Sequence, residues 1–442
     1  MSIWPTARSW KRLAIGLALL TAVALIANGF MAWRTESQLQ SRIAAIRTAG
    51  DPASIADLAP EPIPNAENAA AILAQLAPRI DAFSKEYAQF STSAMGEALD
   101  ERDDKGEPPL PEQLAAIRAM LDKYPDIPAG LAAAAKCEKY ASMADFLVDH
   151  VKFLNEPLKG QAGRIRNAAR FLEWRAEVLL ADGQNEAVVE QGIDLLRLAR
   201  LHDAEPMLVS YLVGVAVRGY AINMLYDGLA AGPVRAELHV ALDKELALHD
   251  TPQRIVHALK SDRAYSASVA AEAGVNPAFT QVPFYGGVIE WPMKRQFIGA
   301  MDYLDAQIAL VADTWPSANK QIGPAGPPVE TGPGTMAELL IPAIEASYLA
   351  EARITATMRA LRIFNALAQY RAEHGREATG LNDLSLPASA TIDPFDDEPL
   401  KLKHTDEGWI VYTVMNDGED DGGDFKELKD YGVAPRKWRV TE

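Results

Sequence analysis

The fold of the C-terminal quarter follows from Leu367-Ala-Gln-Tyr-Arg-Ala-Glu-His-Gly375 and, after a short loop, Asp393-Pro-Phe-Asp-Asp-Glu-Pro-Leu400. Gly375, placed directly after an apolar helical pattern, is typical of a helix C-cap and ends a helix predicted over Met336–His374. The Asp393-Pro394 pair begins a turn, because the residue before a proline avoids the helical region. The stretch therefore predicts a long helix that leads through a turn into a small module.

Two strands are predicted after this turn. Apolar and polar residues alternate in Lys401–His404, whereas Trp409–Val414 carries bulky apolar residues on both faces. A period of two residues is that of a β-strand. Gly408 ends the connection between the two runs and can adopt a positive φ. We therefore expect a β-hairpin that packs on the preceding helix.

A glycine-rich acidic stretch, Asn416-Asp-Gly-Glu-Asp-Asp-Gly-Gly-Asp424, follows the hairpin. The order of helix, Asp-Pro-Phe turn, hairpin and acidic loop resembles the globular end of the major pseudopilins of type II secretion. The resemblance implies a small α+β module over residues 335–442 that holds Ca²⁺ in its last loop and docks to secretion or pilus-type machinery. It does not extend to the N-terminus, which lacks the processed hydrophobic helix with a glutamate at its fifth position.

The charge of the acidic loop also points to a cation site. Residues 393–424 contain eleven acidic residues and two lysines, in a chain whose net charge is −17. Carboxylates at this density repel one another unless water or a cation screens them. Ca²⁺ accepts six to eight oxygen ligands in flexible geometry. A solvated acidic turn is the alternative. The predicted ligands are Asp417, Glu419, Asp420, Asp421 and Asp424.

The N-terminal region contains a candidate membrane anchor. Leu13–Trp33 is 21 residues long without a charge, enough to cross about 30 Å of hydrocarbon as a helix. Arg8, Lys11 and Arg12 precede it, and positive residues tend to stay in the cytoplasm. We therefore expect a cytoplasmic tail (1–12), one span in the inner membrane, and a periplasmic or otherwise extracytoplasmic body. A cleaved signal peptide is the alternative, although no small-residue cleavage site ends the segment.

Composition limits the functions of the body. The chain has 442 residues, of which 49% are hydrophobic, so it can bury a sizeable core. Its acidic balance argues against nucleic-acid binding and against broad adhesion to anionic lipid. Cys137 is the single cysteine, which excludes an intrachain disulfide.

The middle of the chain is predicted to be helical. Residues 34–64 are expected to extend the anchor helix into solvent and then to form a proline-rich linker. Residues 65–322 show repeated apolar stripes at helical spacing without a fixed repeat length, which indicates an irregular, short solenoid-like α-helical domain. A Gly/Pro linker at 323–334 would join it to the C-terminal module. The predicted fold class is therefore mainly α with a small α+β module.

One helix of this region is compatible with either a membrane span or a position in the core of the domain. Pro206–Tyr226 carries a single charge, Arg218, and is long enough to span a bilayer. An arginine at the middle of a membrane costs roughly 2.5–3.5 kcal/mol on insertion scales. We therefore interpret this segment as a helix buried in the core of the domain.

Signals for catalysis are few. Glu173 and Glu177 are candidates for the single acid of a helical glycan-cleaving enzyme, but no flanking motif selects either. His239, His249 and His257 lie near Glu245 and Asp250 without the four-residue spacing of a helical zinc site. His202-Asp203 with Glu205 fits a helix C-terminus better than a general base.

Two functional hypotheses follow. The first is a membrane-anchored, non-enzymatic envelope protein with a helical interaction domain and a Ca²⁺-stabilised pseudopilin-like module that contacts an envelope protein. The second is a cell-wall glycan hydrolase with an accessory C-terminal module. A deep acidic cleft containing a glutamate of raised pKa would favour the hydrolase. A helical groove without buried acids, together with an intact ion loop, would favour the first hypothesis, which we prefer on sequence.

Overall fold

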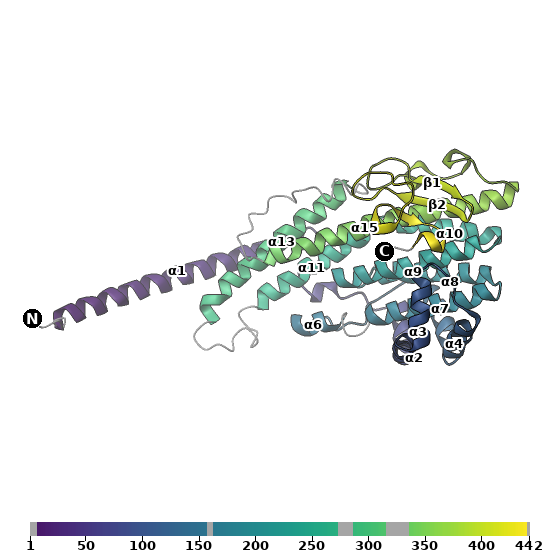
Figure 1. Ribbon diagram of the computed structural model, residues 1–442. Coiled ribbons are helices and arrows are strands. Elements are labelled where there is room, and N and C mark those ends of the chain that lie inside the picture. Colours follow the sequence, from purple (N-terminus) through teal and green to yellow (C-terminus); the bar gives the residue numbers. More distant parts are fainter. Residues whose placement is uncertain (1–6, 157–161, 273–285, 315–335, 440–442) are drawn as a thin grey trace, which may run out of the picture.

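The computed structural model describes residues 7–156, 162–272, 286–314 and 336–439 (Figure 1). It confirms a mainly helical protein with a small antiparallel sheet near the C-terminus. The predicted linker at 323–334 lies outside the described residues. The long elements are α1 (Ala7–Thr48), α2 (Ala69–Ser91), α3 (Ala94–Asp103), α4 (Pro111–Leu121), α5 (Asp126–Ala135), α6 (His150–Glu156), α7 (Ala162–Ala181), α8 (Asn185–His202), α9 (Leu208–Ala230), α10 (Ala236–His249), α11 (Gln253–Glu272), α13 (Gly286–Thr314), α15 (Met336–His374), β1 (Lys401–Thr405), β2 (Gly408–Thr413) and β3 (Tyr431–Val433).

Helix α1 projects from the body and leaves its apolar half uncovered (Figure 1). It is long and apolar enough to span a membrane. The sequence predicted that its second half extends into solvent, but this half packs on the body. Leu39, Ile43 and Ile46 are buried against α11 and α13, because they repeat at the spacing of one helix face. Helix α1 and the body are thus joined by a packed interface.

The segment after α1 also differs from a free linker. Ala53 and Ile55 are 1% and 3% exposed, and the Ile55 N–H donates to Ser268 Oγ of α11 at 2.8 Å. Asp51 forms ion pairs with Lys260 and Arg263 of the same helix. Proline keeps this segment extended, but its apolar and charged side chains attach it to α11.

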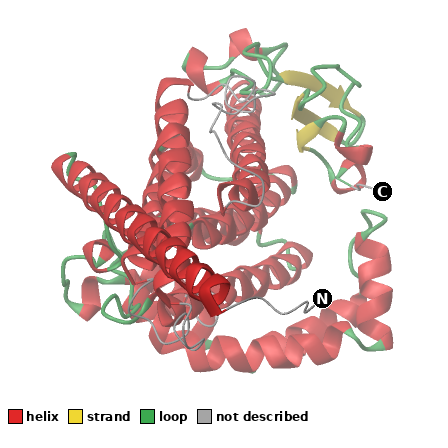
Figure 2. Ribbon diagram, turned by 90° about the vertical axis from the view of Figure 1, so that its left-hand side faces the viewer, coloured by secondary structure: helices red, strands yellow, loops and turns green. Residues whose placement is uncertain are grey.

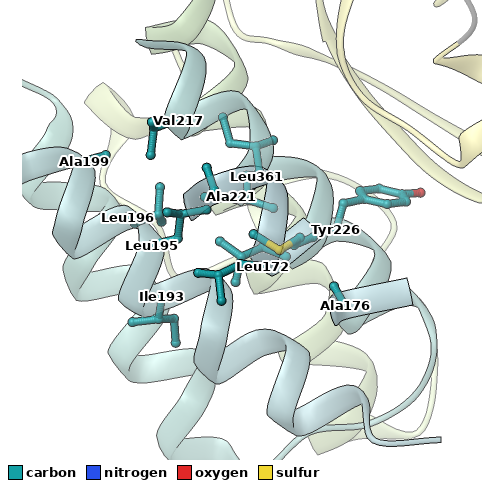
Figure 3. Close-up of a cluster of buried hydrophobic side chains, with 14 of the residues drawn as sticks. Leu172, Ala176, Ile193, Leu195, Leu196, Ala199, Val217, Ala221, Tyr226 and Leu361 are labelled. Atoms are coloured by element: carbon teal, nitrogen blue, oxygen red, sulfur yellow. The ribbon is translucent and has the colours of Figure 1, made fainter. Parts of the chain in front are cut away.

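The centre of the body is formed by α7, α8 and α9. Figure 3 shows Leu172 of α7, Leu195 and Leu196 of α8, and Ala221 of α9 converging in one cluster of buried side chains. Helices α8 and α9 approach closely at Gly192, where a Cβ would lie 2.5 Å from Leu225 Cγ. Close packing of large apolar side chains at this density accounts for most of the stability of such a core.

The structure places α9 in the core, although the helix is also long and apolar enough for a membrane span. Its one arginine, Arg218, is fully buried. The Arg218 guanidinium donates to Asp203, and its Nε–H donates to His249 Nδ1 at 3.0 Å. A buried charge that is paired and hydrogen-bonded in this way is typical of a protein interior.

Helix α15 carries the C-terminal sheet. The strands have the order β1-β2-β3 and are antiparallel, with Leu402 opposite Val411 and Val411 opposite Val433. The hairpin agrees with the sequence interpretation, but β3 was missed because three residues, Tyr-Gly-Val, give no recognisable period. Figures 1 and 2 show the sheet beside α15, at the end of the molecule away from the free end of α1.

The C-terminal module shares its core with the helical body. Phe364 of α15 stacks on Tyr226 of α9, with ring centroids 4.2 Å apart. The buried cluster that contains Leu172 and Leu196 continues through Leu361 to Val411 and Val433 of the sheet. One continuous apolar core therefore connects α2 to β3.

Candidate functional site: an acidic cavity at the C-terminal tail

The five predicted calcium ligands lie in the loop after β2, where local hydrogen bonds occupy several of their oxygens. Asp417 Oδ1 accepts from the Glu419 N–H at 3.1 Å, and Asp424 Oδ1 accepts from the Lys426 N–H at 3.1 Å. Asp420 Oδ1 accepts from the Tyr412 hydroxyl and the Gly422 N–H. Glu419 and Asp421 are exposed. Across the described residues, no group of three or more acids, histidines or cysteines is arranged to hold a metal ion.

Asp430 is an acid of this loop that the sequence interpretation missed. It is fully buried, and its Oδ2 accepts from the Gly423 N–H at 2.8 Å, while Oδ1 has no hydrogen-bond partner among the residues that the structure describes. Burial, reinforced by the charges of Asp420 and Asp421, raises the pKa of Asp430 to about 6. On the same loop, Lys403 Nζ donates to the Gly422 carbonyl at 2.6 Å. A cation of the protein itself therefore already contacts one backbone oxygen of the loop.

A second acidic site lies between the helical body and the C-terminal tail. A cavity of about 410 Å³ is bounded by the end of α3, one face of α7, the last turns of α9 and the tail after β3. Its ionisable lining consists of five carboxylic acids and two arginines. These are Asp103, Asp104, Glu173, Glu177, Asp227, Arg436 and Arg439.

The two arginines neutralise two of these acids. Arg436 donates to Glu177 and, from Nε and Nη2, to Asp227 Oδ2 at 3.3 and 3.2 Å. Arg439 donates to Asp227 Oδ1, and its guanidinium lies 5.4 Å from the centroid of the Tyr226 ring. Such charge-assisted pairs are the strong hydrogen bonds of proteins. The tail is thereby fixed against α7 and α9.

Glu173 differs from its neighbours. It lies one helical turn before Glu177 on the cavity face of α7, and its carboxyl group forms no hydrogen bond or ion pair with the residues that the structure describes. Burial raises the pKa of Glu173 to about 8, and the negative charges of Asp103 and Glu177 add to the rise. At neutral pH this side chain therefore holds a proton that faces an open, acid-lined cavity.

The tail closes over the cavity because of one glycine. Gly106 has φ +65°, in the left-handed region, and a Cβ there would lie 2.7 Å from Lys437 Cα. Only glycine permits both this backbone conformation and the close approach of the tail. The position of Arg436 thus depends on a loop more than 300 residues earlier in the chain.

The histidine candidates belong to the core of the body. His202, His239 and His249 are at most 2% exposed, and burial lowers the pKa of both His202 and His249 to about 4. His239 Nδ1 lies 2.8 Å from Asn365 Oδ1 of α15. His202 and His249 are therefore neutral at pH 7, and all three histidines are packed between helices.

The sequence singled out Glu173 and Glu177 but not the rest of the cavity. Their spacing of four residues places both on one face of α7, a signal that is visible in the sequence. Asp103, Asp227 and Arg436 come from three distant segments, and only the packed fold brings them together.

Comparison of the chain with models of protein families, with curated proteins and with solved structures returned no match. The interpretation of the cavity therefore depends on its own geometry and charge.

Proposed function

We propose that this protein is a membrane-anchored binding protein whose acidic cavity takes a ligand with an ammonium or guanidinium group. The observation that carries the proposal is the unpaired Glu173, with its pKa of about 8, in a cavity where acids outnumber arginines. Arg436 and Arg439 are both engaged with Glu177 or Asp227, which leaves the carboxylates of Asp103 and Asp104 and the protonated carboxyl group of Glu173 without an ion pair in the cavity among the described residues.

A bound organic cation would complete this charge balance. A positive group within about 4–6 Å of a carboxyl group favours its ionised form, so the ligand would lower the pKa of Glu173. Binding at neutral pH would therefore release a proton, and affinity would rise with pH until Glu173 is ionised in the free protein. A pocket of several hundred Å³ suits a small ligand or a projecting side chain.

The anchor and the position of the cavity complete the proposal. Leu13–Trp33 would cross the inner membrane with the N-terminus in the cytoplasm, because Arg8, Lys11 and Arg12 precede it. The body would then be extracytoplasmic. The C-terminal tail lies in the half of the body away from the free end of α1, so the cavity would be held at a distance from the bilayer (Figure 1).

Calorimetric titration of the full chain in detergent with cadaverine tests this proposal. Titrations at pH 7 in two buffers of different ionisation enthalpy measure the protons released. We expect saturable binding with release of up to one proton, no binding of the neutral 1,5-pentanediol, and loss of the proton release in Glu173→Gln. Equal behaviour of cadaverine and the diol, or absence of binding by both, would reject a cation site.

A hydrolase acting on cell-wall glycan is the second candidate, and the same proton on Glu173 favours it. A carboxylic acid that stays protonated at neutral pH can protonate a glycosidic oxygen, and Glu177 and Asp227 supply carboxylates nearby. Incubation with purified cell-wall glycan should then release soluble reducing fragments. The release should vanish in Glu173→Gln and persist in Asp104→Asn.

The acidic loop supports a separate proposal, that Ca²⁺ stabilises the C-terminal module and that the module docks to an envelope protein of secretion or pilus-type machinery. Five acids lie in the loop, and the buried Asp430, which accepts from the Gly423 N–H of the loop, has an Oδ1 without a hydrogen-bond partner among the described residues. Because the module shares its core with the body, its calcium binding is best measured on the full chain.

A further inference from the structure

The first turns of α13 run beside the apolar part of α1. Side chains of α1 are exposed from Trp10 to Ala27 wherever the structure describes them. From Asn28 onward one face is covered at helical spacing, through half-buried Met31 to buried Thr35 and Leu39. Protein contact with α1 thus begins inside the apolar segment, before its last residue, Trp33.

Three groups of contacts define how α13 lies against α1. The Trp291 indole N–H donates to Asn28 Oδ1 at 2.9 Å. Lys294 Nζ lies 2.8 Å from Glu36 Oε2 and 2.7 Å from Glu290 Oε1. Further along, Arg42 pairs with Asp302 and Asp305. The contacts advance together along both helices, so α13 is parallel to α1 and its N-terminal end points the same way as the free end of α1.

The depth of this contact follows from helix geometry. Asn28 precedes Trp33 by five residues, which at a rise of about 1.5 Å per residue is about 7–8 Å along the helix. If Leu13–Trp33 fills the roughly 30 Å hydrocarbon layer, Trp291 lies at the level of the outermost part of that layer. In the sequence, Glu290 is the first charged residue after Glu272.

We propose that the N-terminal end of α13, around Trp291, is a second membrane contact that lies in the leaflet nearest the body beside α1. This inference rests on the proposed anchor. The protein would meet the bilayer through two parallel helices, and the body would be held at a fixed orientation to the membrane surface.

The side chains at the contact have the chemistry of a membrane interface. The Asn28 amide would be costly in hydrocarbon without a hydrogen-bond partner, and Trp291 supplies one. Tryptophan itself is enriched where hydrocarbon meets headgroups, and Trp33 lies in the same leaflet, closer to the headgroups. The ion pair of Lys294 with Glu36, three residues after Trp33, marks the polar edge of the contact, and Lys294 also neutralises Glu290 within α13. The exposed Arg295, one turn after Trp291, would reach lipid phosphate.

Spin-label accessibility in liposomes tests the proposal with the full chain. A Cys137→Ser background carries one cysteine at a time, at Arg295, at Phe30 of α1 or at Val240 of α10. Phe30 and Val240 are 56% and 61% exposed and serve as the lipid and water references. Collision rates with oxygen and with a water-soluble nickel complex report the depth of each label.

We expect the label at residue 295 to be at least threefold less accessible to nickel than the label at 240, and to lie shallower than the label at 30. Equal nickel accessibility at 295 and 240, with residue 30 in lipid, would overturn the second contact alone. A water-exposed residue 30 would overturn the anchor as well. Protection at 295 accompanied by spin–spin broadening between copies would show that a second copy, not lipid, covers α13.

Discussion

Buried acids occur in two regions of this molecule, and their surroundings differ. In the core, Glu351 receives hydrogen bonds from Arg254, at 3.1 Å from Nε and 2.5 Å from Nη2, and from the Tyr211 hydroxyl. In the cavity at the tail, Glu173 has a carboxyl group without such partners among the described residues. Both acids lie on long helices, but Glu351 is 1% exposed, whereas Glu173 is half-buried and lines the open cavity.

Hydrogen bonding of the carboxyl group distinguishes buried acids with a structural role from buried acids with a functional one. A buried carboxylate with complete hydrogen bonding needs nothing further, and it fixes how its helices pack. A carboxyl group that is buried without a partner must hold a proton, and the fold gains no stability from it. A buried carboxyl group without a partner is expected mainly where it binds a ligand or takes part in a reaction. The cavity is therefore the stronger functional candidate.

The largest effect is expected from breaking the core pair. Glu351→Gln should leave the Arg254 guanidinium buried without a carboxylate and lower the free energy of unfolding by about 3–5 kcal/mol. Denaturant melts in detergent measure this. The matched control is Asp126→Asn. The side chains of Arg79 and Asp126 are 44% and 46% exposed, so the loss of their ion pair should lower the free energy of unfolding by less than about 1 kcal/mol. Similar losses in both variants would remove the contrast between buried and exposed pairs.

A smaller loss is expected at the glycine that admits the tail. Gly106→Ala combines an unfavourable positive φ with a contact 2.7 Å from Lys437 Cα, and should cost about 2–3 kcal/mol. Gly183→Ala is the control, since Gly183 has φ +71° and nothing lies within 4 Å of its Cβ position. The excess loss in Gly106→Ala measures the tail contact. If the two variants melt alike, the tail does not close the cavity.

The pH dependence of stability should identify Glu173. Its pKa of about 8 in the folded protein exceeds the ordinary value of 4.5, so the folded state holds more protons between these values. Wild-type stability therefore falls as pH rises through that window. Glu173→Gln removes this loss and should raise the free energy of unfolding by about 1–2 kcal/mol at pH 8.5. This gain is smaller than the full value of about 1.4 kcal/mol per pKa unit, because the cavity is open to water.

Thermal melts of the two proteins at pH 5 and pH 8.5 make this comparison. The variant and the wild type should differ little at pH 5, where Glu173 is protonated in the folded state and only partly ionised in the unfolded chain. A gain of equal size at both pH values would show that the substitution acts through packing and not through ionisation.

The smallest effect is expected at the exposed loop acids. Asp417→Ala with Asp421→Ala should change stability by less than about 0.5 kcal/mol in chelator, because both side chains are exposed. Millimolar Ca²⁺ should raise the melting temperature of the wild type and leave the double variant unchanged. A wild-type melt that does not respond to Ca²⁺ would leave the loop as a solvated acidic turn.

Local patterns predicted the elements better than their contacts. The hairpin, the end of α15 at His374 and the long apolar helix α1 followed from period, glycine and hydropathy. Asn65 and Asn68 are both N-cap residue types before the first helix of the body, and the structure selects Asn68, whose side chain accepts from the Ala70 N–H. More than one asparagine can cap this helix, and a proline such as Pro78 is tolerated inside it. Tertiary packing determines where the helix begins and ends.

The site was only partly predictable for a similar reason. Glu173 and Glu177 share a helix face, so the sequence could name them together. Nothing local marks Gly106 or Arg436 as their neighbours, because these contacts arise when the tail folds back across α7 and α9. Asp430 was missed because its burial depends on the sheet, and its short strand β3 has no detectable pattern.

The protonation of Glu173 is the central claim, and infrared difference spectroscopy measures it most directly. The carboxylic-acid carbonyl band is compared between the wild type and Glu173→Gln from pH 5 to pH 10. We expect a band that is present at pH 7, is absent from the variant, titrates near pH 8 and shifts to lower pH when cadaverine is added. A Glu173 that is already ionised at pH 6 without ligand would contradict it.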